Sequence, residues 1–168
     1  MKYLPLLIIL TCLNIFGQKK APNKENTQEW IKSVLNSYSG SVIEFGNEKM
    51  TDFQYADTSL CKEEFGGTTI YINTVLIKNI SNIIIRKQID SDNYLMIFSC
   101  NKGNCFKEGV NICSKNRTDN SINYSYTSNK LVIKLSQSIK NDELDKRLIK
   151  AYKHLINLYG GKTIDETF

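Results

Sequence analysis

The chain has 168 residues, and its 22 Lys and Arg against 17 Asp and Glu give a net charge of +5. This excess is too mild to indicate a nucleic-acid partner, which usually requires a concentrated basic patch. The length suits one domain with a substantial buried core.

The N-terminal apolar run predicts export. Lys2 precedes a short apolar stretch that ends at Gly17, which is the layout of a secretory signal peptide. A membrane span would need about 20 apolar residues, and this run is shorter. We expect residues 1–17 to be removed, leaving a periplasmic or secreted chain of net charge +4 with no transmembrane segment. A lipid anchor on Cys12 is disfavoured, because Thr11 stands where lipoproteins carry Gly, Ala or Ser.

We expect residues 18–26 to form a linker and residues 27–168 to form a single domain. Thr27 is a suitable helix cap, and apolar side chains then recur at helical spacing from Trp30 to Tyr38. The pattern predicts an N-terminal helix that ends at Ser39-Gly40.

The C-terminal region predicts the clearest helix of the chain, with Asn141 as its cap and Gly160-Gly161 as its stop. One face of this helix is apolar, and it carries Leu144, Leu148, Ala151, Tyr152, Leu155 and Tyr159. A stripe of this kind packs against a core.

Between the two helices the sequence is rich in Ile, Val, Thr, Tyr and Phe, which indicates strands. The predicted strands are 41–45, 53–56, 68–73, 82–89, 94–100, 105–113, 122–126 and 130–135. Turn residues at 90–93 and at 101–104 predict two hairpins. Consecutive strands joined by short turns predict an α+β fold: an antiparallel β-meander, a roll or half-barrel, with the N-terminal and C-terminal helices packed on it.

This order of elements is similar to a pleckstrin-homology-type roll in layout. The chain also resembles small uncharacterised exported proteins of the Bacteroidota, through Phe16-Gly17-Gln18, Trp30-Ile31 and the segment from Ala151 to Ile156. The resemblance covers most of the chain and implies no particular activity.

Four cysteines remain after cleavage, namely Cys61, Cys100, Cys105 and Cys113. An even number in an exported chain favours disulfides. If the 101–104 turn closes a hairpin, Cys100 and Cys105 lie on opposed strand positions, about 4.5–5.5 Å apart and within disulfide reach; Cys61 would then join Cys113. Only one pair has the spacing of a zinc knuckle, so we expect no metal site.

The polar face of the C-terminal helix carries Lys146, Arg147, Lys150 and Lys153. These side chains form either a solvated face or a docking surface for an acidic partner or a lipid headgroup. His154, the only histidine, lies at the border of the apolar stripe and is interpreted as a half-buried structural imidazole. No catalytic residue and no cofactor is assigned, because the motifs of nucleophilic and phosphate-binding sites are missing.

The sequence therefore favours an exported, non-catalytic domain of the bacterial cell envelope that binds a protein, a peptide or an envelope component. One alternative is a small-molecule or lipid carrier that uses the concave face of the sheet. Another is a hydrolase that uses carboxylates or His154. The sequence leaves the ligand and the oligomeric state open.

Overall fold

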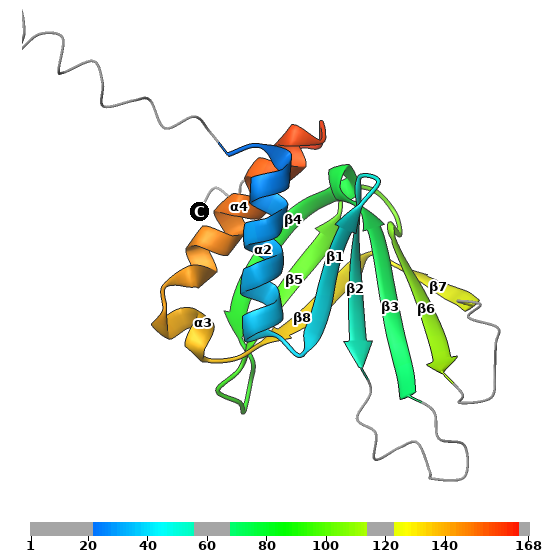
Figure 1. Ribbon diagram of the computed structural model, residues 1–168, viewed down its shortest axis with the longest axis horizontal. Coiled ribbons are helices and arrows are strands. Elements are labelled where there is room, and N and C mark those ends of the chain that lie inside the picture. The colour runs from blue at the N-terminus through cyan, green and yellow to red at the C-terminus, as the bar shows by residue number, and fades with distance from the viewer. Residues whose placement is uncertain (1–21, 56–67, 114–122, 165–168) are drawn as a thin grey trace, which may run out of the picture.

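The computed structural model describes residues 22–55, 68–113 and 123–164, and these form an α+β fold with two antiparallel sheets and helices on one side (Figure 1). The five-stranded sheet has the order β1-β2-β3-β6-β7, and the three-stranded sheet has the order β4-β5-β8. The strands are β1 Ser41–Gly46, β2 Lys49–Tyr55, β3 Thr68–Leu76, β4 Ile80–Lys87, β5 Tyr94–Cys100, β6 Phe106–Cys113, β7 Asn123–Ser128 and β8 Lys130–Leu135. The helices are α2 Lys24–Tyr38, the 3-10 turn η2 Ile77–Asn79, α3 Ser138–Asn141 and α4 Leu144–Leu158.

Three long, bent strands pass through both sheets. β3 continues through η2 into β4, β5 continues through residues 101–105 into β6, and β7 continues through Asn129 into β8. In one sheet β6 lies between β3 and β7, and in the other β5 lies between β4 and β8. The two sheets are therefore the two halves of one bent antiparallel meander, which confirms the predicted fold class.

The bends of the three long strands lie beside one another and are joined by backbone hydrogen bonds. The Cys100 amide donates to the Asn129 carbonyl at 3.0 Å, and the Asn101 amide donates to the Asn79 carbonyl at 2.9 Å. At this corner Cys100 and Cys105 form a disulfide, with their Cα atoms 5.7 Å apart. These contacts tie the bends into one corner between the sheets.

The predicted hairpin at 101–104 is wrong, although the pairing of its two cysteines is the predicted one. Cys100 pairs across the ladder with Ile80, and Phe106, the residue after Cys105, pairs with Ser128. The two cysteines thus flank a bend in one strand and do not face each other on two strands. By contrast, the predicted hairpin at 90–93 is confirmed, because Lys87 pairs with Tyr94 on either side of it.

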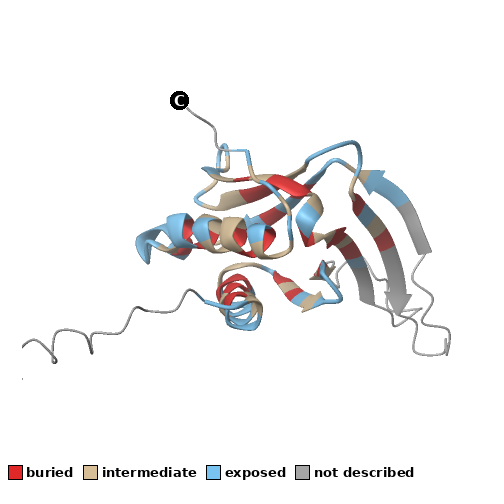
Figure 2. Cartoon of the chain, turned by 90° about the horizontal axis from the view of Figure 1, so that it is seen from above, coloured by how far each residue is buried: buried red, intermediate tan, exposed pale blue. Residues whose placement is uncertain are grey.

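The core lies between the helices and the two sheets, where the buried positions gather (Figure 2). Leu148 and Leu155 are fully buried, which confirms the predicted stripe of α4. Tyr152, from the same face, is fully buried as well and meets Phe98 of β5 edge to face, with ring centroids 5.0 Å apart. Helix α4 therefore packs its apolar face into the concave side of the meander.

Both helices begin at residues other than those predicted. α2 starts at Lys24, inside the expected linker, and Asn23 is its cap, accepting from the Asn26 amide at 2.9 Å. Thr27 instead lies buried in the first turn, where its hydroxyl donates to the Asn23 carbonyl at 2.7 Å. Asn23 is a favourable capping residue in its own right, so the helix begins one turn earlier than predicted.

The predicted cap of the C-terminal helix, Asn141, is wrong as well, because it ends the separate short helix α3. Helix α4 begins after Glu143, which adopts a left-handed conformation with φ +54°. The predicted stop is confirmed, since Gly160 has φ +77°, a conformation that glycine adopts at little cost. A Cβ at Gly161 would lie 2.8 Å from the Lys78 carbonyl oxygen, so the chain end packs closely on η2.

Candidate functional site

An open groove runs between α2 and α4, with a volume of about 800 Å³. One wall comes from the start of α2 and the other from the outer face of α4. The lining residues are Pro22, Asn26, Thr27, Trp30, Arg147, Lys150, Ala151 and His154. On α4 these positions follow the i, i+3, i+4, i+7 spacing of a single helix face.

Trp30 and Arg147 join the two walls of the groove. The guanidinium carbon of Arg147 lies 5.5 Å from the centre of the Trp30 ring, within the range of a cation–π interaction. Trp30 is half-buried, so part of its ring packs on the core and part lines the groove. The indole thus gives the groove an apolar surface directly beside a fixed positive charge.

His154 lines the groove on the α4 side. Its Nε2 lies 2.8 Å from the carbonyl oxygen of Pro22, and since a carbonyl only accepts, the imidazole donates this hydrogen bond. The contact holds the segment before α2 against α4. His154 is half-buried, as predicted, and its hydrogen bond is structural.

The charge of the groove is positive. Arg147 and Lys150 line it, and none of its lining residues is acidic. An apolar floor with cations on its rim is complementary to a segment that carries both apolar and acidic side chains.

Only two of the four basic residues predicted as a docking face line the groove. Arg147 and Lys150 line the groove, whereas Lys146, which is exposed, and Lys153, which is half-buried, are not among the lining residues. Sequence reasoning placed Trp30 in the core and so missed its part in the groove. Trp30 is the only tryptophan of the chain, but the sequence carries no signal for the packing of α2 beside α4 that places its ring in the groove.

The remaining predicted site residues lie elsewhere. Cys100 and Cys105 form the corner disulfide, far along the chain from the groove residues. Cys12 and Cys61 lie outside the described residues, as does the expected signal peptide, so the pairing of Cys61 with Cys113 stays a prediction. Across residues 22–55, 68–113 and 123–164, no three His, Cys, Asp or Glu side chains cluster closely enough to hold a metal ion.

Within the same described ranges, every helix is too short or too polar to cross a bilayer. Comparison of the chain with protein-family models, with curated proteins and with solved structures gives no match. The geometry of the groove is therefore the basis on which a function is assigned.

Proposed function

We propose that this protein is an exported, non-catalytic binding domain that docks an acidic, amphipathic peptide segment of an envelope protein in the α2–α4 groove. The observation that carries the proposal is the juxtaposition of the Trp30 ring with Arg147 and Lys150 on one concave surface. Export is supported by the N-terminal apolar run and by a disulfide, which persists in oxidising compartments.

The non-catalytic part of the proposal rests on how the reactive groups of the groove are used. The His154 imidazole donates to the Pro22 carbonyl, and the Thr27 hydroxyl donates to the Asn23 carbonyl. A general base and a nucleophile must be free to exchange protons with a substrate. Both contacts hold the start of α2 in place, and among the described residues no hydrogen bond joins the second ring nitrogen of His154 to a nucleophile.

The shape of the groove favours a peptide over a bilayer surface. A peripheral protein inserts protruding apolar side chains between lipid headgroups. Trp30 instead lies half-buried within a concave surface, where a narrow chain segment can reach it and a flat membrane cannot. Recognition of an amphipathic segment by a groove is a common mode of peptide binding.

The arrangement of α4 argues against a lipid carrier that uses the concave sheet face. Tyr152 of α4 is fully buried there, with its hydroxyl 3.1 Å from the Met50 sulfur of β2 and its ring on Phe98 of β5. The helix thus fills the space in which an acyl chain would have to lie.

Trp30 offers a direct test, because it is the only tryptophan and lines the groove. We would titrate the protein with a short, tryptophan-free peptide of Glu, Leu and Ala and follow intrinsic fluorescence. The same peptide with Lys in place of Glu, and vesicles of phosphatidylglycerol, serve as comparison ligands. A saturable response to the acidic peptide alone is expected.

Charge reversals on α4 provide the matched control. Lys150→Glu should weaken binding by about three- to tenfold, the range for loss and reversal of one exposed ionic contact. Lys146→Glu changes the net charge equally but lies outside the groove lining, so it should have a smaller effect. Equal effects of the two reversals, equal binding of the Lys peptide, or a response to vesicles only would each overturn the proposal.

A further inference from the structure

A second, polar pocket lies where the two edges of the meander meet. The end of α2 and the residues before β1 are joined there to the end of β8. The contacts are an isolated bridge, Ser39 with Leu135, and the hydrogen bond from the Ser136 amide to the Tyr38 carbonyl, 2.7 Å long. Beyond this point β1 and β8 separate. The opening between them has a volume of about 390 Å³, within the range of about 300–1,000 Å³ typical of small-molecule sites.

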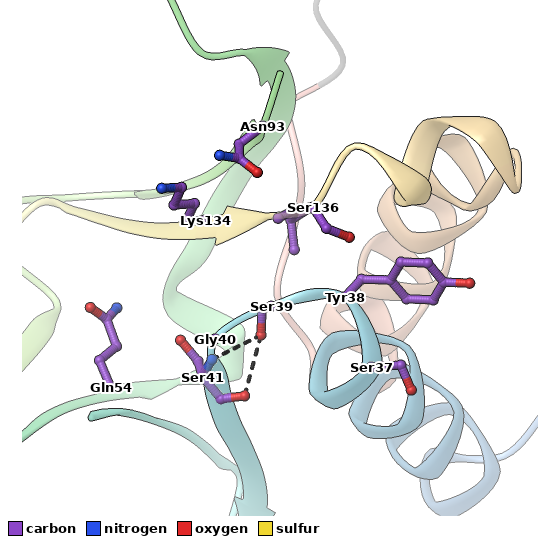
Figure 3. A pocket seen from close by; sticks show the side chains of 10 residues that line it. Ser37, Tyr38, Ser39, Gly40, Ser41, Gln54, Asn93, Lys134 and Ser136 are labelled. Carbon is purple, nitrogen blue, oxygen red and sulfur yellow. Dashed lines mark hydrogen bonds between the residues drawn. The ribbon is translucent and has the colours of Figure 1, made fainter. Parts of the chain in front are cut away.

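Polar side chains face this seam pocket from both sides (Figure 3). Gln54, Ser41 and Ser39 lie on the side of β1 and β2, and Lys134, Asn93 and Ser136 lie on the side of β8 and the β4–β5 turn. Lys134 is the one charged residue in the lining. A ligand here would meet many hydrogen-bonding groups and one positive charge.

A buried carboxylate behind the pocket fixes two of these groups. Asp52 is fully buried and accepts from the Gln54 amide nitrogen at 2.7 Å and from the hydroxyl of Ser41. Because the nitrogen of Gln54 donates to Asp52 and, at 3.4 Å, to the Val132 carbonyl, the carbonyl oxygen is the group that Gln54 can offer to the pocket. Ser41, likewise, can offer lone pairs of its hydroxyl. The β1–β2 side thus presents acceptors.

The opposite side presents a strong donor, the Lys134 ammonium, together with the hydroxyl of Ser136 and the amide of Asn93, whose nitrogen also donates to the Ser91 hydroxyl at 2.9 Å. Hydroxyl groups both donate and accept, so a ligand with several hydroxyls can satisfy the two sides at once. An acidic group on the same ligand would pair with Lys134.

We infer that the seam pocket binds a hydroxyl-rich, acidic ligand of monosaccharide size, with Gln54 and Ser41 accepting from its hydroxyls and Lys134 binding its acidic group. Asp52 is a positioning residue that sets the orientation of Gln54. This inference is independent of peptide docking, since the seam pocket and the α2–α4 groove share no lining residue.

The test is a titration of isotope-labelled protein followed by amide chemical shifts, with D-glucuronate, D-glucose and sodium acetate as probes. We expect D-glucuronate to shift the amides of residues 37–41, Gln54 and 134–136, D-glucose to shift them with a larger Kd, and acetate to be the weakest. Absence of shifts with both sugars up to their solubility limit would overturn the inference. Equal binding of acetate and D-glucuronate would mark a plain carboxylate site and would overturn the sugar assignment.

Lys134→Met should raise the Kd for D-glucuronate about tenfold, the effect of losing one hydrogen bond from a charged donor. Lys130→Met is the control, because Lys130 is also exposed and lies on the same face of β8 but does not line the pocket. Both substitutions remove one surface charge and should leave the fold intact. Equal effects of the two variants would contradict the assignment of Lys134.

Discussion

Cys100 and Cys105 close a disulfide across the corner at which one long strand passes from the three-stranded sheet into the five-stranded sheet. The bends of the two neighbouring strands are hydrogen-bonded to the bend at Cys100, through the carbonyls of Asn129 and Asn79. The disulfide therefore holds a bend that is shared by three strands.

Replacing both cysteines, Cys100→Ser with Cys105→Ser, should lower the free energy of unfolding only modestly. The sequence separation is five residues, and so short a loop restricts the unfolded chain less than the 15-residue loop that gives about 3 kcal/mol. Urea unfolding of the double variant against the oxidised parent measures this. A loss well above about 3 kcal/mol would mean that the bend depends on the bridge for its native packing.

The apolar face of α4 should be the most sensitive part of the core. Leu148→Ala and Leu155→Ala each remove a fully buried side chain and should cost about 2–5 kcal/mol in unfolding free energy. Asn157→Ala, an exposed position on the same helix, is the control and should change stability by less than about 0.5 kcal/mol. Melting temperatures of both leucine variants within a degree or two of the parent would show that α4 is not part of the core.

These elements show which parts of the fold were predictable from the sequence. The strands 94–100 and 130–135 and the stripe of α4 were found because their patterns are local. Strand 130–135 and α4 bury the face that the pattern marks, and strand 94–100, apolar on both faces, is buried at three consecutive residues. The bend at 101–104 was mistaken for a hairpin because polar turn residues suit both. Whether a bend or a hairpin forms depends on the pairing of Cys100 with Ile80 and of Phe106 with Ser128, and both partners are distant in the sequence.

The groove was predicted only in part for a similar reason. Arg147 and Lys150 could be assigned to a polar helix face, but the apolar floor comes from Trp30 on another helix. A helical stripe in the sequence shows which side chains are apolar, but it does not show how much of each side chain is buried by its neighbours. Only the packing of α2 beside α4 leaves the Trp30 ring half-buried at a surface.

Asp145 in the first turn of α4 should make stability fall at acid pH. Burial raises its pKa, but the hydrogen bond from the Lys140 ammonium and that from the Lys146 amide outweigh burial, so the pKa lies below its ordinary value. A carboxylate with a lowered pKa stabilises the fold above its unfolded pKa of about 3.9, and this contribution is lost as the pH falls through the folded pKa.

Asp145→Asn should accordingly cost about 1 kcal/mol near neutral pH, the size of a favourable charge at a helix N-terminus. The difference from the parent should shrink as the pH falls below the unfolded pKa. Urea unfolding at a series of pH values measures this difference, with Glu143→Gln, an exposed position just before the helix, as a comparison. A difference that stays constant with pH would show that the ion pair with Lys140 is not what stabilises the helix start.

Asp52 should have the opposite pH dependence. Burial raises its pKa, and the hydrogen bonds from Gln54, Ser41 and Asn73 oppose this only in part. Its oxygen Oδ1 is buried without a hydrogen-bond partner among the described residues. A raised folded pKa means that ionisation favours the unfolded chain. The contribution of Asp52 to stability therefore falls as the pH rises from the unfolded pKa, about 3.9, through the folded pKa, and is constant above it.

Two substitutions of Asp52 separate its charge from its hydrogen bonds. In Asp52→Asn the new amide oxygen can still accept from Gln54 and Asn73, while the buried charge is removed. This variant should thus gain stability over the parent as the pH rises toward neutrality. Asp52→Leu leaves the Gln54 and Asn73 donors without their acceptor, so it should be less stable than Asp52→Asn by about 1–3 kcal/mol for each donor left buried. Urea unfolding of the three proteins between about pH 4 and pH 7 spans the unfolded pKa and the neutral range. Parallel stability curves for the parent and Asp52→Asn would mean that Asp52 does not titrate in the folded protein over this range. This result would contradict the raised pKa that burial gives to Asp52.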